Sequence, residues 1–318
     1  MLADLLQLVF GLMLLLGGGE VLVRGAATLA RCMGISPLVV GLTIVSFGTS
    51  APELAVNVAA AWRQAGDIAF GNIMGSNMAN IGLIVAATAL IKPLAVSSRI
   101  VVREIPMMIF VTLVAAVFAL DSAIMGEAGV YDRADGVVLL MLLGVFLYYT
   151  VGDAIQDRDQ DVATPALNQT MRTSVLLVLG GSLALVGGAE LTVDGGVGLA
   201  RAMGISEVLV GLTVVAVGTS LPELAASVMA AYRGHPDIAI GNVVGSNIFN
   251  LALVLGVASI LSPIPVPEGG LGDLAAVVVL CFVLWATTFA RPPRIVRLEG
   301  ILLLVIYLIY ISWRANLY

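Results

Sequence analysis

The chain has 318 residues, of which 60% are hydrophobic and only 11% are charged, and its net charge is −6. Average soluble domains contain about 25% charged and about 45–50% apolar residues, because polar side chains must cover their surface. The composition therefore excludes a soluble enzyme, a nucleic-acid-binding protein and a disordered chain. It predicts a polytopic membrane protein that is surrounded by the lipid bilayer.

Ten apolar runs, bounded by charged residues, proline or glycine, approach the roughly 20 residues that a spanning helix needs. In chain order, we expect helices near 5–30, 37–62, 68–91, 99–120, 134–152, 173–199, 207–232, 238–261, 271–290 and 298–314. The expected fold class is thus an all-α polytopic membrane protein with ten transmembrane helices. The longest polar segment separates the fifth helix from the sixth and is too short to hold a domain.

The sequence repeats itself after 170 residues. The string GLTIVSFGTSAPELAVNVAAAWR at 41–63 returns as GLTVVAVGTSLPELAASVMAAYR at 211–233. Over residues 41–80, 24 of 40 positions are identical to the residue 170 positions later. The chain therefore consists of two homologous halves. We expect a first five-helix repeat at 1–152, a cytoplasmic linker at 153–172 and a second five-helix repeat at 173–318.

Five helices per half is an odd number, so the second half should enter the membrane from the opposite side. Such inverted repeats are typical of secondary transporters, which bind their substrate near the midplane between the repeats. Basic residues favour the cytoplasmic side of a membrane. With the N-terminus outside, ten basic residues lie on inner loops and four on outer loops. We therefore expect both termini outside the cell.

Each half carries the string G-T-S-x-P-E-L in the middle of an apolar helix, at 48–54 and at 218–224. A charged side chain at this depth costs roughly 2.5–3.5 kcal/mol on insertion and indicates a functional site. Glu53 and Glu223 are therefore expected near the centre of the bilayer, where they face the inside of the protein.

The proline in each string should disturb its helix. Pro52 and Pro222 have no N–H and clash with the carbonyl four residues earlier. We therefore expect a kink in both helices and free backbone carbonyls around 46–49 and 216–219. Irregular backbone at membrane depth is tolerated where it lines a cavity or is buried in protein.

A second string, G-N-x-x-G-S-N-x-x-N, follows at 71–80 and at 241–250. Ser76 and Asn80 are four residues apart and therefore lie on one helical face. The glycines of this string also recur every four residues, which predicts a close contact between helices.

The converging groups are two glutamates, several asparagines, serine and threonine hydroxyls, and backbone carbonyls. This set of oxygen ligands, without His, Cys or Met, suits hard cations such as Ca²⁺ and Na⁺. A site charge of −2 matches one Ca²⁺ or two or more Na⁺ ions. Ions that share ligands compete, and competition at one alternating site is ion exchange.

Together, the two doubled strings resemble the α-repeats of the calcium/cation antiporter superfamily, most closely its prokaryotic sodium/calcium exchanger branch. The resemblance covers the whole chain. It implies a non-enzymatic antiporter of the prokaryotic plasma or inner membrane that exchanges Na⁺ for Ca²⁺ without a cofactor and needs no oligomer to form its site. It also implies that the first and sixth helices slide across the rest.

The same resemblance implies a set of twelve ligand residues, in which Ser46 and Ala216 act through their carbonyl oxygens. They are Ser46, Thr49, Ser50, Glu53, Ser76, Asn80, Ala216, Thr219, Ser220, Glu223, Ser246 and Asn250.

One position departs from the pattern of the superfamily, several of whose members carry an aspartate where this chain has Asn250. A neutral amide can ligate a cation through its oxygen but cannot take up a proton. A proton-coupled or K⁺-coupled Ca²⁺/cation exchanger therefore remains an alternative. A passive cation channel is the alternative from a different class, although one fused inverted pair encloses a single midplane site rather than a continuous pore.

Overall fold

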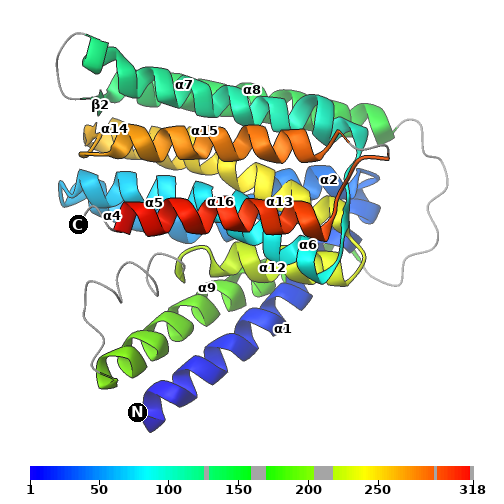
Figure 1. The fold of residues 1–318 in the computed structure, drawn as a ribbon. Helices are drawn as coiled ribbons and strands as arrows, with labels where there is room; N and C mark the ends of the chain where they lie inside the picture. The colour runs from blue at the N-terminus through cyan, green and yellow to red at the C-terminus, as the bar shows by residue number, and fades with distance from the viewer. Residues whose placement is uncertain (125–128, 159–169, 204–217, 290–291, 316–318) are drawn as a thin grey trace.

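The computed structural model describes residues 1–124, 129–158, 170–203, 218–289 and 292–315. The described part is predominantly helical, and most of its helices run along one common axis (Figure 1). Eight of its helices are long and apolar enough to cross a membrane, and one bent pair of helices would form a ninth span. The protein is therefore a multi-pass membrane protein.

The first half contains both straight and interrupted spans, in which η denotes a π-helical segment. Its helices are α1 (Leu2–Met33), α2 (Pro37–Val40), η1 (Gly41–Val45), α3 (Ser46–Thr49), α4 (Ala51–Trp62), α5 (Gly66–Ala79), η2 (Asn80–Val85), α6 (Ala86–Ile91), η3 (Ile100–Glu104), α7 (Ile105–Ile124) and α8 (Arg133–Arg158).

The second half repeats this order. Its described helices are α9 (Met171–Ala202), α12 (Leu221–Tyr232), α13 (Pro236–Ile248), η5 (Phe249–Leu255), α14 (Gly256–Leu261), α15 (Gly270–Thr287) and α16 (Arg297–Ala315). The expected helix at 207–232 is described only from residue 218 onward, and α12 forms its second part.

The segment expected as a linker, 153–172, is helical at both ends. Helix α8 continues to Arg158, and α9 begins at Met171 after Thr170, whose hydroxyl accepts the Thr173 N–H at 3.3 Å. The boundary differs from the expectation because polar residues end an apolar run but do not by themselves end a helix.

The predicted kink occurs where the first G-T-S-x-P-E-L string lies. The segments Pro37–Thr49 and Ala51–Trp62 are bent by 44° at Ser50, two residues before Pro52. Ser50 has φ −85° and ψ 2°, and the corresponding Ser220, which precedes α12, has φ −91° and ψ 4°. The same non-helical backbone therefore precedes the glutamate in both halves.

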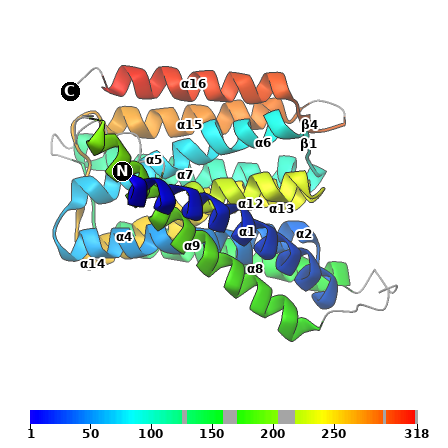
Figure 2. The ribbon, with the colours of Figure 1, turned by 90° about the horizontal axis from the view of Figure 1, so that it is seen from below.

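Helices α1 and α9 lie against each other, antiparallel, and are inclined to the other helices (Figures 1 and 2). Their contact surface is built from glycines that recur every seven residues. A Cβ atom added to any of them would lie 2.5–3.0 Å from an atom of the other helix; they are Gly11, Gly18 and Gly25 on α1 and Gly181, Gly188 and Gly195 on α9. The two backbones therefore touch, which holds α1 and α9 together as one unit.

Two short antiparallel strand pairs tie the halves together at opposite ends of the bundle (Figures 1 and 2). Strand β1 (Leu94–Ala95) pairs with β4 (Arg294–Ile295), and β2 (Val130–Tyr131) pairs with β3 (Ile264–Pro265). Leu94 and Ile264 are 170 residues apart, so corresponding loops of the two halves make corresponding strands.

The most buried spans are the one formed by α5, η2 and α6 and the one formed by α13, η5 and α14. Each contains a π-helical segment that begins at or next to the last asparagine of a G-N-x-x-G-S-N-x-x-N string, Asn80 or Asn250. Such π-bulges are frequent at functional sites because they interrupt the regular helical hydrogen bonds.

Candidate cation-binding site

The polar residues of both strings are buried in the middle of the protein. The expected ligand residues that are at most 3% exposed are Ser46, Thr49, Ser50, Glu53, Ser76, Asn80, Ser220, Glu223, Ser246 and Asn250. Thr219 is half-buried, and Ala216 lies outside the described residues. The helix that carries Glu53 packs against η5, which begins next to Asn250, and the helix that carries Glu223 packs against η2.

Many of these buried side chains have polar atoms without a hydrogen-bond partner among the described residues. They are both carboxylate oxygens of Glu53, Oε2 of Glu223, the hydroxyls of Ser76, Ser220 and Ser246, and the side-chain amides of Asn80 and Asn250. Leaving a buried polar group without a partner costs about 1–3 kcal/mol. The concentration of such atoms around two carboxylates fits a set of ligands for cations.

One hydrogen bond joins the two motif strings directly. The hydroxyl of Ser50 donates to Oε1 of Glu223 at 3.1 Å. Ser50 precedes α4, whereas Glu223 lies on the first turn of α12, so the contact spans the two halves of the chain.

A second contact between the halves runs through asparagines that the expected ligand set does not include. The Thr49 hydroxyl donates to Oδ1 of Asn242 at 3.2 Å, and Nδ2 of Asn242 donates to the Ser227 hydroxyl at 3.0 Å. Asn242 and Ser227 are both buried. A threonine of the first half is therefore held by the second half.

The corresponding residues 170 positions away make the corresponding contacts. Nδ2 of Asn72 donates to the Thr219 hydroxyl at 3.4 Å, and Oδ1 of Asn72 accepts from Nδ2 of Asn57 at 2.7 Å. We call these two chains of hydrogen bonds the Thr49 arm (Thr49, Asn242, Ser227) and the Thr219 arm (Thr219, Asn72, Asn57).

Ser46 plays a different part from the free carbonyl that we expected. Its carbonyl oxygen accepts the Ser50 N–H at 2.9 Å, so the break in the helix does not free it. Its hydroxyl donates to the carbonyl oxygen of Gly41 at 2.7 Å and lies 3.0 Å from that of Asn242. The bend at Ser50 therefore leaves this carbonyl hydrogen-bonded, but a carbonyl oxygen has a second lone pair, so the ligand role of Ser46 stays a prediction.

The predicted close contact at the glycines is confirmed in the second half, whereas in the first half it was wrong, because a Cβ atom on Gly71 or Gly75 would meet nothing within 4 Å. A Cβ atom on Gly241 would lie 3.0 Å from the Leu38 carbonyl oxygen, and one on Gly245 would lie 2.6 Å from the Leu42 carbonyl oxygen. The backbone of α13 therefore lies directly on α2 and η1, which brings Asn242 within reach of Thr49.

A cavity of about 620 Å³ lies between α9 and α4 and reaches the site. Glu190 and Asp194 line it from α9, and Pro52 and Thr219 line it on the opposite side. The acidic side chains favour cations in this cavity, and the half-buried Thr219 connects it to the Thr219 arm.

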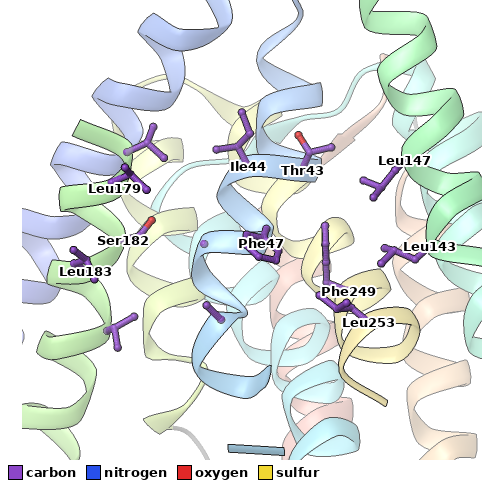
Figure 3. Close-up of a pocket in the computed structure, with 14 residues that line it drawn as sticks. Thr43, Ile44, Phe47, Leu143, Leu147, Leu179, Ser182, Leu183, Phe249 and Leu253 are labelled. Atoms are coloured by element: carbon purple, nitrogen blue, oxygen red, sulfur yellow. The ribbon is translucent and has the colours of Figure 1, made fainter. Parts of the chain in front are cut away.

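A second cavity, of about 600 Å³, is apolar and lies between α9 and α8 (Figure 3). Phe47 and Phe249 make an edge-to-face contact in it, with their ring centroids 5.9 Å apart, and Ser182 of α9 faces Gly48. Its lining offers almost no ligands for an ion, but it separates part of α9 from the neighbouring helices.

The chain has the following similarities to known proteins. Residues 4–152 and 173–315 match the family described as Sodium/calcium exchanger protein. The chain is 35% identical to the inner membrane protein YrbG of Escherichia coli over 98% of this chain and 95% of that protein. It is 32% identical to the sodium/calcium exchanger MaX1 of Methanosarcina acetivorans over 97% of each.

The solved structure of the sodium-calcium exchanger NCX_Mj with zero Na⁺ and Ca²⁺ has the same fold. Its TM-score is 0.84, and the match covers 98% of both chains at 33% identity. These similarities confirm the resemblance that the two doubled strings indicated.

Proposed function

Because the chain belongs to the sodium/calcium exchanger family, we propose that it exchanges Na⁺ for Ca²⁺ by alternating access at one site formed by both halves. The observation that carries the proposal is the set of buried oxygens without partners around Glu53 and Glu223. Two carboxylates, hydroxyls and amide oxygens suit hard cations. In the described residues, no group of three or more His, Cys, Asp or Glu side chains forms a conventional metal site.

The site is the proposed ligand set of twelve residues, with the ion as transported substrate rather than cofactor. A charge of −2 from Glu53 and Glu223 balances one Ca²⁺ or two Na⁺ ions. The two occupants then exclude each other, because they compete for the same carboxylates. Cations reach the site through the cavity that Glu190 and Asp194 line, where the negative side chains raise the local cation concentration.

The two halves are proposed to be inverted five-helix repeats with ten spans in total. Support comes from the antiparallel packing of α1 on α9 and from the corresponding strand pairs at opposite ends of the bundle. The start of α1 and the end of α16 lie at one end of the structure (Figure 1), which agrees with an even number of spans. The positive-inside pattern places that end outside the cell.

Alternating access is assigned to the α1–α9 unit. Its two helices are held together by direct backbone contact, and it meets the other helices through small residues, such as Gly19 against the Ala225 carbonyl and Ser182 against Gly48. Small residues at this surface obstruct sliding less than large, interdigitating side chains would. Sliding of the unit would open the site to one side of the membrane and close it to the other.

The test uses the purified full-length protein in liposomes loaded with Na⁺, K⁺ or acidic buffer. We expect uptake of ⁴⁵Ca²⁺ with internal Na⁺ but not with K⁺ or a pH gradient; for the pH gradient the reason is that Asn250, a neutral ligand, cannot take up a proton. Glu53→Gln and Glu223→Gln should each lower uptake about tenfold to a hundredfold, since each removes a buried charge that binds the ion. Glu268→Gln, at an exposed loop position, is the matched control.

If only a K⁺ gradient or only a pH gradient drives uptake, the coupling ion is K⁺ or H⁺ rather than Na⁺. Conductance steps of single channels would favour the passive channel instead. If no gradient drives Ca²⁺ uptake, or if both glutamine variants transport normally, the proposed function is wrong.

A further inference from the structure

The two hydrogen-bonded arms of the site have opposite donor and acceptor directions, and Asn57 causes the difference. Nδ2 of Asn57 lies 2.7 Å from the backbone carbonyl oxygen of Glu53 and 2.7 Å from Oδ1 of Asn72. A backbone carbonyl only accepts hydrogen bonds, so the amide of Asn57 must turn its nitrogen towards it. Asn72 must then turn its oxygen towards Asn57 and its nitrogen towards Thr219.

Thr219 is therefore an acceptor in its arm. Nδ2 of Asn72 donates to its hydroxyl oxygen at 3.4 Å. A hydroxyl oxygen has two lone pairs. Among the residues that the structure describes, one of the two lone pairs of Thr219 is consequently occupied by an N–H, and the other is left for a cation.

Thr49 is a donor in the other arm, where Ser227 stands in place of Asn57. Nδ2 of Asn242 donates to the Ser227 hydroxyl at 3.0 Å and lies 3.5 Å from the Glu223 carbonyl oxygen, so its oxygen faces Thr49. The Thr49 hydroxyl lies 3.2 Å from that oxygen and 3.3 Å from the Ser46 carbonyl oxygen, and both are acceptors. The single proton of Thr49 is therefore directed to these acceptors, and among the described residues its hydroxyl oxygen accepts no N–H, in contrast to that of Thr219.

We propose that Asn57 determines the balance between Na⁺ and Ca²⁺ at this site by restricting Thr219 to a single lone pair. Asn57 acts through Asn72 and is a positioning residue, not a ligand. An oxygen with two lone pairs can bridge two neighbouring cations, whereas an oxygen with one lone pair binds one. Charge balance requires two or more Na⁺ ions but only one Ca²⁺ ion, so the restriction weakens Na⁺ binding more than Ca²⁺ binding.

The inference rests on the proposed function, and it makes opposite predictions for two reciprocal substitutions. Asn57→Ser gives the Thr219 arm the residue of the Thr49 arm and lets Asn72 turn its oxygen towards Thr219. Ser227→Asn gives the Thr49 arm the residue of the Thr219 arm, so that Asn242 turns its nitrogen towards Thr49. The double variant exchanges the two arms and should resemble the unchanged protein.

The experiment measures ⁴⁵Ca²⁺ uptake by the full-length protein in liposomes at varied external Na⁺ and Ca²⁺. Asn57→Ser should lower the Na⁺ concentration that half-inhibits uptake about fivefold, which corresponds to the free energy of one ordinary hydrogen bond. The half-saturating Ca²⁺ concentration should stay within about twofold of the unchanged protein. Ser227→Asn should raise the half-inhibiting Na⁺ concentration, and Asn57→Ala, which also releases Asn72, should act like Asn57→Ser.

The inference is overturned if folded Asn57→Ser has an unchanged Na⁺ concentration for half-inhibition. It is also overturned if the half-inhibiting Na⁺ concentration and the half-saturating Ca²⁺ concentration change by the same factor, which is what a merely structural role would produce. If Asn57→Ser does not fold, Ser227→Asn alone decides: an unchanged half-inhibiting Na⁺ concentration in that variant overturns the inference.

A second readout separates this inference from the proposed function. The melting temperature of each variant in detergent is measured with NaCl, with CaCl₂ and with neither. If Na⁺ does not drive uptake in the unchanged protein, the proposed function fails, but a larger stabilisation of Asn57→Ser by NaCl alone still supports the inference. Equal stabilisation of all variants by NaCl overturns it.

Discussion

Ser50 and Glu223 are 173 residues apart in the chain, yet the Ser50 hydroxyl donates a hydrogen bond to the Glu223 carboxylate at 3.1 Å. The serine belongs to the G-T-S-x-P-E-L string of the first half, and the glutamate belongs to that of the second. The first half thus helps to orient a charged group of the second half. A site of this kind exists only when both halves are folded against each other.

Replacing Ser50 with alanine should weaken Ca²⁺ binding. The substitution removes the hydrogen bond that Oε1 of Glu223 receives from the Ser50 hydroxyl, and it removes one of the proposed ligands. Hydrogen bonds to charged groups contribute about 1.5–3 kcal/mol, so the half-saturating Ca²⁺ concentration should rise roughly tenfold or more. Equilibrium binding of ⁴⁵Ca²⁺ to the purified protein measures it.

Ser220→Ala is the informative partner of this variant. The Ser220 hydroxyl has no hydrogen-bond partner among the described residues, so its removal breaks no contact between the halves. We expect a smaller rise in the half-saturating Ca²⁺ concentration than for Ser50→Ala. Equal rises in the two variants would mean that ligation, and not the bond to Glu223, determines the effect.

Neighbouring glycines of α1 offer a test of the contact between α1 and α9. A Cβ atom on Gly18 would lie 3.0 Å from both Ala184 Cβ and the Leu185 backbone nitrogen, whereas one on the exposed Gly17 meets nothing within 4 Å. Gly18→Ala should therefore cost about 1–3 kcal/mol through overpacking. Thermal unfolding in detergent should show a clear fall in melting temperature.

Gly17→Ala is the matched control, because it adds the same methyl group to the same helix one position earlier. It should leave the melting temperature unchanged or raise it slightly, since alanine favours a helix by about 1 kcal/mol over glycine. The close packing of α1 on α9 would be contradicted if both variants behaved alike.

An ion pair attaches α1 to the end of α12. The carboxylate of Glu20 on α1 is paired with Arg24 on the same helix and with Arg233, which follows α12. Arg233→Gln should loosen this end of α1. A partly exposed ion pair contributes about 0.2–1 kcal/mol, so amide hydrogen exchange in α1 near Glu20 should become at most about fivefold faster.

Arg63→Gln provides the comparison, because Arg63 occupies the corresponding position 170 residues earlier. Arg63 is exposed and forms no ion pair within the described residues. Its replacement should leave the exchange of α1 unaltered. Faster exchange in both variants would point to a general loss of stability rather than to the loss of one contact.

His235, in the loop before α13, should make the protein sensitive to acid. Partial burial and the positive charges of Arg31 and Lys92 lower the pKa of His235 below its ordinary value of about 6.5. The unfolded chain therefore binds a proton more readily than the folded protein does. This contribution to stability is complete above about pH 6.5 and decreases as the pH falls through 6.5 towards the lowered pKa.

His235→Gln removes that contribution. The melting temperature of the variant should fall less between pH 7 and pH 5 than that of the unchanged protein. Parallel curves for the two proteins over this range would contradict the assignment to His235.

Much of the site could be expected from the sequence, because the two strings recur at a constant shift. The buried positions of Glu53 and Glu223 agree with that expectation. The asparagines of the two arms, Asn72 and Asn242, were not expected as partners of the threonines. A signal was present, since both stand directly after the first glycine of their string. Only the contact with the other half gives them a role.

The packing of α1 on α9 was missed for a similar reason. Gly11, Gly18 and Gly25 recur every seven residues, and the same spacing returns 170 positions later. A seven-residue spacing places residues on one face of a helix but does not identify the helix that covers this face. The structure identifies it as α9.

The sequence by itself determined that this is a membrane protein of two related halves, and it predicted an oxygen-rich cation site. Hydropathy, repetition and the placement of a glutamate in an apolar run are properties of neighbouring residues, so they can be read from the chain. The tertiary structure alone decided that Thr49 donates to Asn242 whereas Thr219 accepts from Asn72. The direction of a hydrogen bond between distant residues depends on which groups packing brings within about 3 Å, and no local pattern specifies that.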